Sequence, residues 1–441
     1  MLGGVDDLSG PADVRHVSQP VGHQDDLHLR RPADVGLRDR LPAVSPNYRY
    51  GGRRGRGEGA ARSVGPALRA AGDQPAVLHV IGQYGLAGAE KQLARLAARQ
   101  ARRGRRVEVC VLGGELAPAL VELTRPARAA HLPGKPRGLR RLRALARKVR
   151  SEGWELLAGQ LFSGNLYAVA AGRWTDTPVT TFEGGLEPWS RGYHWSVCRW
   201  YWRRAALVEV NALAVRSNVI SHGGPADKLR LIYNGVEPQP PVTVEEQRRA
   251  RNELGLGAEP VVCMVANLHR PKDPETLLEA VAGLETARGP ATLLLAGDGP
   301  LRRILEDRVR RRGMSDRVRL LGRISDVRSV LAAADVSCLS SRAEGLSNSI
   351  IEALAAGVPC AASRAGGNAE LLGDDERGLL FEVGDVAGCR WVLRRLLTEP
   401  VLAQKLAAAG RDWVVEELSF ERNLALHDNL YAEARRRWSR R

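Results

Sequence analysis

The sequence lacks any uninterrupted apolar segment of about 18 residues, the length that a membrane-spanning helix requires. It also lacks, at its start, the basic and then apolar pattern of a secretory signal, so we expect none. The six cysteines are scattered, with no Cys-x-x-Cys pair and no cluster with histidine. This spacing argues against a zinc ribbon or a disulfide scaffold, and it favours a reducing, cytoplasmic compartment.

Positive charge is what the chain has in excess, with a formal net charge of +16 over 441 residues. Residues 76–250 hold 27 Lys and Arg against 14 Asp and Glu, whereas the residues after 250 are nearly neutral. A basic segment beside a neutral one indicates a surface that meets an anionic partner, such as phospholipid, a lipid diphosphate or nucleic acid. An arginine-rich coding bias is the simpler alternative. Because no helix-turn-helix, RNA-recognition or zinc module is evident, we expect no nucleic-acid partner.

The chain divides into four parts by its composition and by the spacing of its apolar residues. Residues 1–74 are rich in Gly, Pro, Asp and Arg without periodicity, and we interpret them as a disordered or non-native leader. Short apolar runs then alternate with helical patterns, first over 75–238 and again over 239–417, and a terminal helix falls within 418–441. The predicted strands are 76–82, 106–112, 154–159, 178–182, 206–210 and 229–234, followed by 260–267, 291–297, 317–322, 335–340 and 358–363.

This alternation predicts an α/β protein with two doubly wound, Rossmann-like domains that face a central cleft. Buried strands joined by helices form right-handed βαβ units, and hence parallel sheets covered on both faces. The Pro-rich segment 234–243 is the predicted linker. Ligands of such sheets bind outside the carboxyl ends of the strands.

Glycines occupy positions 82, 85 and 88, between the first predicted strand and the first predicted helix. Backbone N–H groups of such a loop, with the helix N-terminus, can approach an anion closely. The spacing is not that of a dinucleotide fingerprint, and a glycine turn required only by packing explains it as well.

A stronger signal lies after the strand at 335–340. Glu344 is predicted on the loop, Glu352 lies more than a turn into the next helix, and the helix begins near Gly345, Leu346, Ser347 and Asn348. The helix start offers N–H groups to a phosphate, and a carboxylate accepts hydrogen bonds from a ribose diol. An acidic pair around such a start suits a nucleoside diphosphate. Two solvated helix glutamates are the alternative.

Polar side chains also follow the first strand of the second domain. Asn267, Arg270 and Lys272 are predicted on its loop, where a cation would neutralise a leaving diphosphate. An ordinary surface lysine is the alternative interpretation of Lys272.

Together these segments resemble the group 1 retaining glycosyltransferases (family 4), which have the GT-B fold. The resemblance extends from about residue 76 to 437. It rests on the following segments, which occur in the family's order: HVIGQYGLAGAEKQLARLAARQARRG, LRLIYNGVE, VANLHRPKDPETLLEA, LLLAGDGPLR, VRLLGRISDVRSVLAAADV, EGLSNSIIEALAAGVPCAAS, GGNAELL and RGLLF.

The resemblance implies a nucleoside-diphosphate sugar donor, no cofactor and no required metal. It implies that Glu352 holds the ribose and that Glu344 lies beside the donor sugar. Lys272 would contact the diphosphate, and the backbone of Gly345, Leu346 and Ser347 would bind the distal phosphate. The loop around Gly85 and Gly88 would close over the donor from the first domain.

The chain departs from the family at two places. Asn267 stands where many members have arginine, for which Arg270 could compensate. Glu183, in Phe-Glu-Gly-Gly, stands where many members have histidine, and we expect it to bond a sugar hydroxyl. We therefore predict catalytic roles for Glu344, Lys272 and Glu183, in a front-face reaction in which the departing phosphate takes the acceptor's proton.

The basic first domain points to a saccharide or lipid-linked acceptor and to an anionic membrane surface. In segment 138–150, Leu139, Leu142, Leu145 and Val149 share a helix face among basic residues. Such a helix either lies on a bilayer or packs into the core with a solvated basic side. The alternatives for the whole chain are another GT-B enzyme, such as an epimerase or phosphorylase, and a non-catalytic sugar-binding family member.

Overall fold

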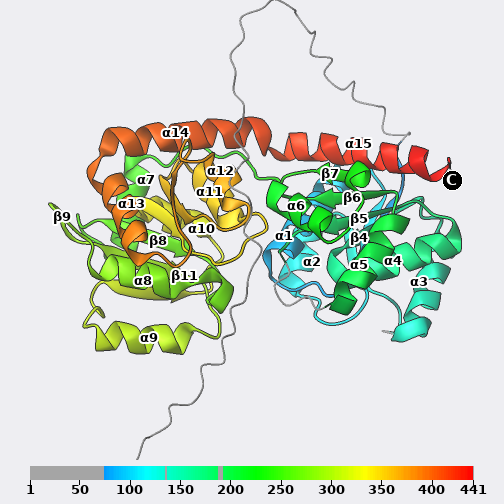
Figure 1. Cartoon of the computed structure of the whole chain (residues 1–441), viewed down its shortest axis with the longest axis horizontal. Coiled ribbons are helices and arrows are strands. Elements are labelled where there is room, and N and C mark those ends of the chain that lie inside the picture. The colour runs from blue at the N-terminus through cyan, green and yellow to red at the C-terminus, as the bar shows by residue number, and fades with distance from the viewer. Residues whose placement is uncertain (1–73, 135–136, 187–191, 441) are drawn as a thin grey trace, which may run out of the picture. The chain divides into compact units, whose positions relative to one another are not determined.

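The computed structural model describes residues 74–134, 137–186 and 192–440 (Figure 1). The predicted leader lies outside these residues except for Gln74. Within the described part the chain forms two α/β lobes, each built on its own parallel sheet. We call residues up to the linker, with the C-terminal helix, the first lobe, and the remainder the second lobe.

The sheet of the first lobe has the order β3-β2-β1-β4-β5-β6-β7, with every pair parallel. Strands β1, β2, β4, β5 and β6 are buried along their whole length, because they are central strands covered by helices on both faces. The strands are β1 (Val77–Ile81), β2 (Val107–Val111), β3 (Arg128–His131), β4 (Leu156–Gln160), β5 (Val179–Glu183), β6 (Leu207–Val210) and β7 (Leu229–Leu231).

Six helices connect these strands, as the sequence alternation predicts. They are α1 (Gly88–Arg102), α2 (Pro118–Thr124), α3 (Gly138–Glu152), α4 (Leu161–Thr175), α5 (Gly192–Arg204) and α6 (Leu213–Ser221). Helix α3 packs against α4 through Leu145 and Val149, which are buried. The part of the apolar face formed by Leu145 and Val149 therefore belongs to the core, whereas Leu139 at the start of α3 is 72% exposed.

The second lobe has a sheet of order β12-β11-β8-β13-β14-β15, also parallel throughout. Its strands are β8 (Val261–Val265), β11 (Thr292–Ala296), β12 (Val318–Gly322), β13 (Val336–Leu339), β14 (Cys360–Ser363) and β15 (Leu379–Phe381). A small antiparallel pair, β9 (Glu285–Thr286) and β10 (Gly289–Pro290), lies apart from it. The helices are α7 (Val244–Glu253), α8 (Pro274–Ala282), α9 (Arg302–Arg311), α10 (Val327–Ala333), α11 (Asn348–Ala355), α12 (Asn368–Leu372) and α13 (Val386–Thr398).

Two long helices end the chain, α14 (Pro400–Glu417) and α15 (Phe420–Trp438). Helix α14 packs on α11 and α13 of the second lobe, whereas α15 contacts α1 and β5 of the first lobe. The linker and the junction between α14 and α15 run side by side, because Val236 N donates to Leu418 O at 2.8 Å and Phe420 N donates to Val236 O at 3.2 Å. Two segments of chain therefore connect the lobes at one place.

The predicted sheets and their order of elements agree with the structure, but two edge strands were not predicted. Strand β3 has the sequence RAAH and only Ala129 in it is buried, so it shows no apolar run. Strand β15 has only three residues and follows a short helix, α12. Both lie at the edge of a sheet; β3 is mostly solvent-accessible there, whereas β15 is apolar and buried but too short to stand out as a strand.

Candidate active site

Two adjacent strands of the second lobe bring Lys272 and Glu344 together. Lys272 follows β8 in a single 3₁₀ turn, and Glu344 follows β13, the neighbour of β8. Lys272 Nζ lies 2.5 Å from Glu344 Oε1. Glu344 is buried, with 7% of its surface exposed, whereas the lysine side chain is 24% exposed. The pair thus combines a fixed carboxylate with a partly accessible cation.

Backbone contacts hold these two loops together. Arg342 N donates to Pro271 O at 2.7 Å, and Ser340 Oγ donates to Asp273 O at 2.7 Å. Asp273 has a left-handed backbone, with φ of 45°, and its buried carboxylate pairs with the Arg342 guanidinium at 2.9 Å. The position of Lys272 beside Glu344 is therefore determined by the loops and not by the ion pair alone.

Ser341 and His269 are the polar neighbours of the Lys272–Glu344 pair. Ser341 Oγ donates to the same Oε1 of Glu344 at 2.5 Å, so two donors meet one carboxylate oxygen. Burial lowers the pKa of His269, and the Lys272 ammonium lowers it further, against the opposing effect of Glu344. The site therefore presents a cation, a carboxylate and a neutral imidazole next to one another.

The N-terminus of α11 begins directly after Glu344. Gly345, Leu346 and Ser347 lead into the helix, and all three are buried. Ser347 Oγ caps the helix by accepting from Ile350 N at 3.4 Å. A Cβ on Gly345 would lie 2.3 Å from Gly184 O, so this turn lies directly against the first lobe. Helix N–H groups here carry partial positive charge close to Lys272.

Glu352 lies one turn further along α11 and faces the first lobe. Arg95 Nη1 of α1 is 3.6 Å from its Oε1. Both residues line a cavity of about 240 Å³, which linker residue Val236, Arg328 and Phe420 also border. Burial raises the pKa of Glu352, and the positive charges of Arg95 and Lys91 oppose the rise. The carboxylate thus borders a cavity between the lobes.

Asn348 connects the lobes instead of pointing freely into this cavity. Its Oδ1 accepts from Gln92 Nε2 at 3.1 Å and from Asn234 Nδ2 at 2.7 Å. Its own Nδ2 donates to Gly88 O at 3.3 Å. The predicted binding residues Asn348 and Gly88 are therefore brought into direct contact.

The glycine loop is held on the opposite side by residues after β2. Tyr84 N donates to Glu115 O at 2.8 Å, and a Cβ on Gly85 would lie 3.0 Å from the Glu115 carboxylate. Burial raises the pKa of Glu90, in the first turn of α1, and the nearby Glu115 raises it further. Gly85 and Gly88 thus place the start of α1 against that of α11.

Glu183 lies at the end of β5, but its carboxylate is turned into the first lobe. Oε1 accepts from Asn165 Nδ2 at 3.0 Å, from Tyr201 OH at 2.8 Å and from Trp202 Nε1 at 2.8 Å. The residue is buried, and it is the next residue, Gly184, that contacts Gly345. The carboxylate of Glu183 is therefore bound within the first lobe, and it is Gly184 that lies against the turn at the start of α11.

Asn267 and Arg270 are exposed on the loop after β8. Within the described residues neither side chain makes a hydrogen bond or ion pair. A Cβ on Gly299 would lie 2.4 Å from Leu268 O, so the loop after β11 packs tightly beneath this segment. Both side chains are thus free to meet a ligand at the same edge of the sheet as Lys272.

Sequence reasoning missed two contacts between the lobes. Arg95 lies in the first helix, and its spacing gives no sign that it pairs with Glu352. Glu370, in the segment GGNAELL, accepts from Leu213 N at 2.9 Å and from Tyr233 OH at 3.2 Å. Burial raises its pKa, and these donors oppose the rise. The feature that could have indicated Glu370 is an acid three residues after a pair of glycines, Gly366 and Gly367.

No helix among the described residues is both long and apolar enough to cross a membrane. In the same part of the chain, no group of three or more His, Cys, Asp and Glu side chains is arranged to hold a metal ion.

Comparisons with known proteins identify both lobes. The model of group 1 glycosyl transferases matches residues 246–413, and that of glycosyltransferase family 4 matches residues 86–240. Together they span most of the two sheets. The chain belongs to the group 1 glycosyltransferases, with the two-lobed GT-B architecture.

Particular relatives are the 2-deoxystreptamine glucosyltransferase of Streptomyces kanamyceticus and the N-acetyl-alpha-D-glucosaminyl L-malate synthase of Bacillus anthracis. The first is 30% identical over 50% of this chain and 59% of its own length, and the second is 28% identical over 48% and 55%. The chain thus spans little more than half the length of these curated relatives. The crystal structure of Anabaena HepE in complex with UDP and glucose shares the fold, with a TM-score of 0.73 at 20% identity over 81% of this chain and 99% of that one.

Proposed function

We propose that this protein transfers a sugar from a nucleoside-diphosphate sugar to a saccharide or lipid-linked acceptor, in the assembly of a surface polysaccharide or glycolipid. The observation that carries the proposal is the Lys272–Glu344 pair, 2.5 Å apart, at the N-terminus of α11. A cation and a helix N-terminus on one side of a cleft suit a departing diphosphate. Membership of the family supports the same activity.

Each residue has a definite task in this proposal. Lys272 and the N–H groups of residues 345–347 stabilise the leaving diphosphate, with Arg270 and Asn267 beside them. Glu344 lies next to the donor sugar, and Glu352 accepts hydrogen bonds from the ribose. We propose retention of the anomeric configuration, as the family resemblance implies, with the departing phosphate taking the acceptor's proton on the same face of the sugar.

Glu183 has a different task from the one that its sequence position indicates. Its Oε1 already accepts three hydrogen bonds from the first lobe. We propose that it positions the loop of Gly184, which lies against Gly345, and that acceptor contacts come from this loop and α5. Replacing Glu183 would then act through the loop.

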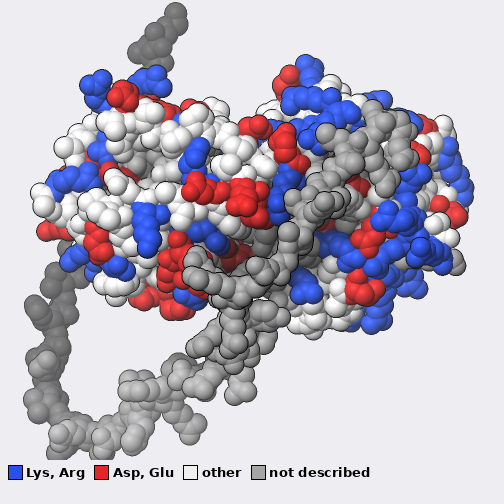
Figure 2. Space-filling view, turned by 90° about the horizontal axis from the view of Figure 1, so that it is seen from above, with Lys and Arg blue, Asp and Glu red and all other residues white. Residues whose placement is uncertain are grey.

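The first lobe, which would bind the acceptor, carries most of the chain's net positive charge. Figure 2 shows Lys and Arg gathered on that half of the molecule. We propose that it works at an anionic membrane surface on the cytoplasmic side. The contact would be electrostatic, because Leu145 and Val149 of α3 are buried in the lobe. Leu139 at the start of α3 is 72% exposed and can add an apolar contact.

The test is a thermal-shift screen of nucleoside diphosphates and their sugars, UDP first, followed by transfer of labelled sugar to membrane extracts. A bound donor raises the melting temperature by mass action. We expect one nucleotide to stabilise the protein and Lys272→Met to abolish the shift, measured from the melting temperature of the unliganded variant, which falls because Glu344 is left buried without its cation. Absence of any shift across the screen would overturn the proposal.

A further inference from the structure

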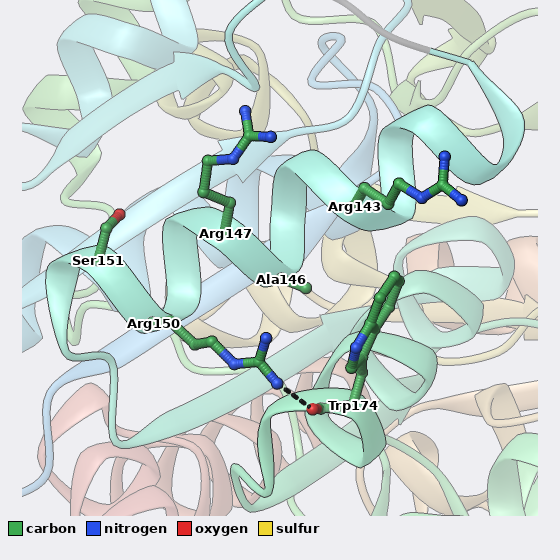
Figure 3. Close-up of a pocket in the computed structure, with 6 residues that line it drawn as sticks. All are labelled: Arg143, Ala146, Arg147, Arg150, Ser151 and Trp174. Carbon is green, nitrogen blue, oxygen red and sulfur yellow. Dashed lines mark hydrogen bonds between the residues drawn. The ribbon is translucent and has the colours of Figure 1, made fainter.

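The outer side of the first lobe has a cavity that the transfer reaction does not use. It has a volume of about 430 Å³ and is formed by α3 and the end of α4 (Figure 3). It is lined by Arg143, Ala146, Arg147, Arg150, Ser151 and Trp174. Half of these residues are arginines, and none is acidic.

The sequence of α3 places these arginines on one side of the helix. Arg140, Arg143, Arg147 and Arg150 follow one another at intervals of three and four residues, so they share a face. All four are exposed, because Leu145 and Val149 occupy the opposite face and are buried. Core packing thus presents a row of guanidinium groups to solvent.

The positive charge of this row is not compensated by the protein. Among the described residues, none of these four arginines takes part in an ion pair. The acids that follow α3 and α4 in sequence have other partners: Glu152 pairs with Lys148 at 2.9 Å, Glu155 pairs with Arg435 at 3.6 Å, and Asp176 Oδ1 accepts from Trp438 Nε1 at 3.0 Å. An uncompensated row of this kind attracts an anion strongly.

One arginine of the cavity is already fixed in orientation. Arg150 Nη2 donates to Trp174 O at 2.6 Å, which leaves its other N–H groups available. The Trp174 side chain borders the same cavity and is 47% exposed, an unusual exposure for a residue of this size. The cavity therefore offers guanidinium donors next to an open aromatic face.

The cavity lies away from the reaction cleft. Helices α3 and α4 both end there, before β4 and β5 begin, so the cavity belongs to the amino ends of these parallel strands. Gly85 and Gly184 follow the carboxyl ends of β1 and β5 in the same sheet. A ligand in the cavity would thus leave the donor and its pair of acids undisturbed.

We propose that this cavity is a binding site for a phosphate monoester or diester, separate from the donor site. Guanidinium groups bind phosphate oxygens with two parallel hydrogen bonds, and the volume accommodates a phosphorylated headgroup larger than inorganic phosphate. The site anchors the lobe on its ligand and takes no part in bond formation. The inference does not depend on the identity of the donor.

The test compares the full chain with Arg143→Gln/Arg147→Gln. The matched control, Arg303→Gln/Arg311→Gln, removes two exposed arginines from α9 of the second lobe. The probes are glycerol 3-phosphate in solution, vesicles of phosphatidylcholine alone, and vesicles that also contain phosphatidylglycerol. We expect the wild type and the control to bind glycerol 3-phosphate or the anionic vesicles, and the cavity variant to bind at least about tenfold more weakly.

The arms of the experiment separate the sources of phosphate. Binding of anionic vesicles alone assigns a lipid headgroup, and binding of glycerol 3-phosphate assigns a soluble ester. Lys272→Met serves as a second control, since binding that it abolishes would belong to the donor site. Equal binding by the cavity variant and the wild type, or no binding of either probe by the wild type, would overturn the proposal. So would loss of the nucleotide-induced thermal shift in the cavity variant.

Discussion

Lys272 Nζ and Glu344 Oε1 lie 2.5 Å apart although the two residues are separated by 72 positions in the chain. Neighbouring parallel strands end beside each other, and the loops that follow them carry the pair. The ammonium is therefore held by a buried carboxylate before any ligand arrives. Such preorganisation means that the charge need not be rearranged during the reaction.

We expect Glu344→Gln and Lys272→Met each to lower the rate of sugar transfer by about 100-fold or more. Lys272→Met removes the cation at the leaving diphosphate, and Glu344→Gln removes the carboxylate that holds this cation and lies next to the donor sugar. Glu306→Gln is the matched control, since Glu306 pairs with Arg302 within α9 at 2.8 Å and lies outside the loops that follow β8 and β13. The measurement is the initial rate with radiolabelled donor. A Glu344→Gln enzyme with the wild-type rate would contradict the assignment.

Binding of the nucleotide should depend on the ionisation of Glu352. Burial raises the pKa of Glu352, and only the carboxylate accepts hydrogen bonds from both ribose hydroxyls. Affinity should therefore fall as the pH drops through this pKa. Calorimetric titration of the nucleoside diphosphate between pH 5 and pH 8 measures the effect.

Two variants isolate the contribution of Glu352. Glu352→Gln should bind more weakly and lose this part of the pH dependence. Arg95→Gln should shift the transition to higher pH, because Arg95 holds the pKa of Glu352 down. Identical pH profiles for the wild type and Glu352→Gln would show that the ribose does not contact this carboxylate.

Close approach of the two lobes should be sensitive to one methyl group. Gly345→Ala would place Cβ 2.3 Å from Gly184 O, which neither backbone can accept without moving apart. We expect a loss of activity of about tenfold or more with little change in the urea midpoint, since the contact lies between lobes and not within a core. Gly257→Ala, where Cβ would meet only the flexible side chain of Glu259 in the second lobe, is the control. Full activity of Gly345→Ala would show that this contact is not needed in the reacting state.

The docking of α15 should depend on pH through His427. Its Nε2 lies 3.1 Å from Glu209 Oε1, and both side chains are buried. Burial by itself lowers the pKa of His427, but the charge and hydrogen bond of Glu209 outweigh it, so the pKa is raised above its ordinary 6.5. The stabilisation is thus complete below pH 6.5 and is lost as the pH rises through the raised value.

Urea unfolding at pH 6 and pH 9 tests the predicted direction of this pH dependence. The free energy of unfolding of the wild type should decrease with pH more steeply than that of His427→Gln. At pH 6 the substitution should cost about 3–5 kcal/mol, because it leaves Glu209 as a buried charge without its partner. A wild type and variant with parallel pH profiles would exclude the charged pair.

Sugar transfer should continue after treatment with a chelator. Lys272 and the helix N-terminus provide positive charge at the proposed leaving group, which is the task that a divalent cation performs elsewhere. We expect the rate in EDTA to remain within about twofold of that with Mg²⁺. A loss in EDTA that Mg²⁺ restores would contradict this expectation.

The sequence predicts the layered fold because apolar runs of five residues and helical spacing are local properties. Glu344 and Lys272 could be placed at one edge of the sheet for the same reason, since both follow buried strands. The orientation of Glu183 could not be predicted, because its partners Asn165, Tyr201 and Trp202 lie 18 or 19 positions away on two helices. The Arg95–Glu352 contact depends on how the two lobes pack against each other, and the spacing of apolar residues along the chain does not determine that packing.

The paired crossing at Val236 and Leu418 has a consequence for dissecting the protein. The first lobe is assembled from both ends of the described chain, since α15 packs on it and places His427 in contact with Glu209. Truncation after the linker would therefore remove α15 and leave the buried carboxylate of Glu209 without His427. Conversely, after a single proteolytic nick between residues 237 and 243, the C-terminal fragment would still carry α15, whose contacts with α1 and β5 would keep the two fragments associated.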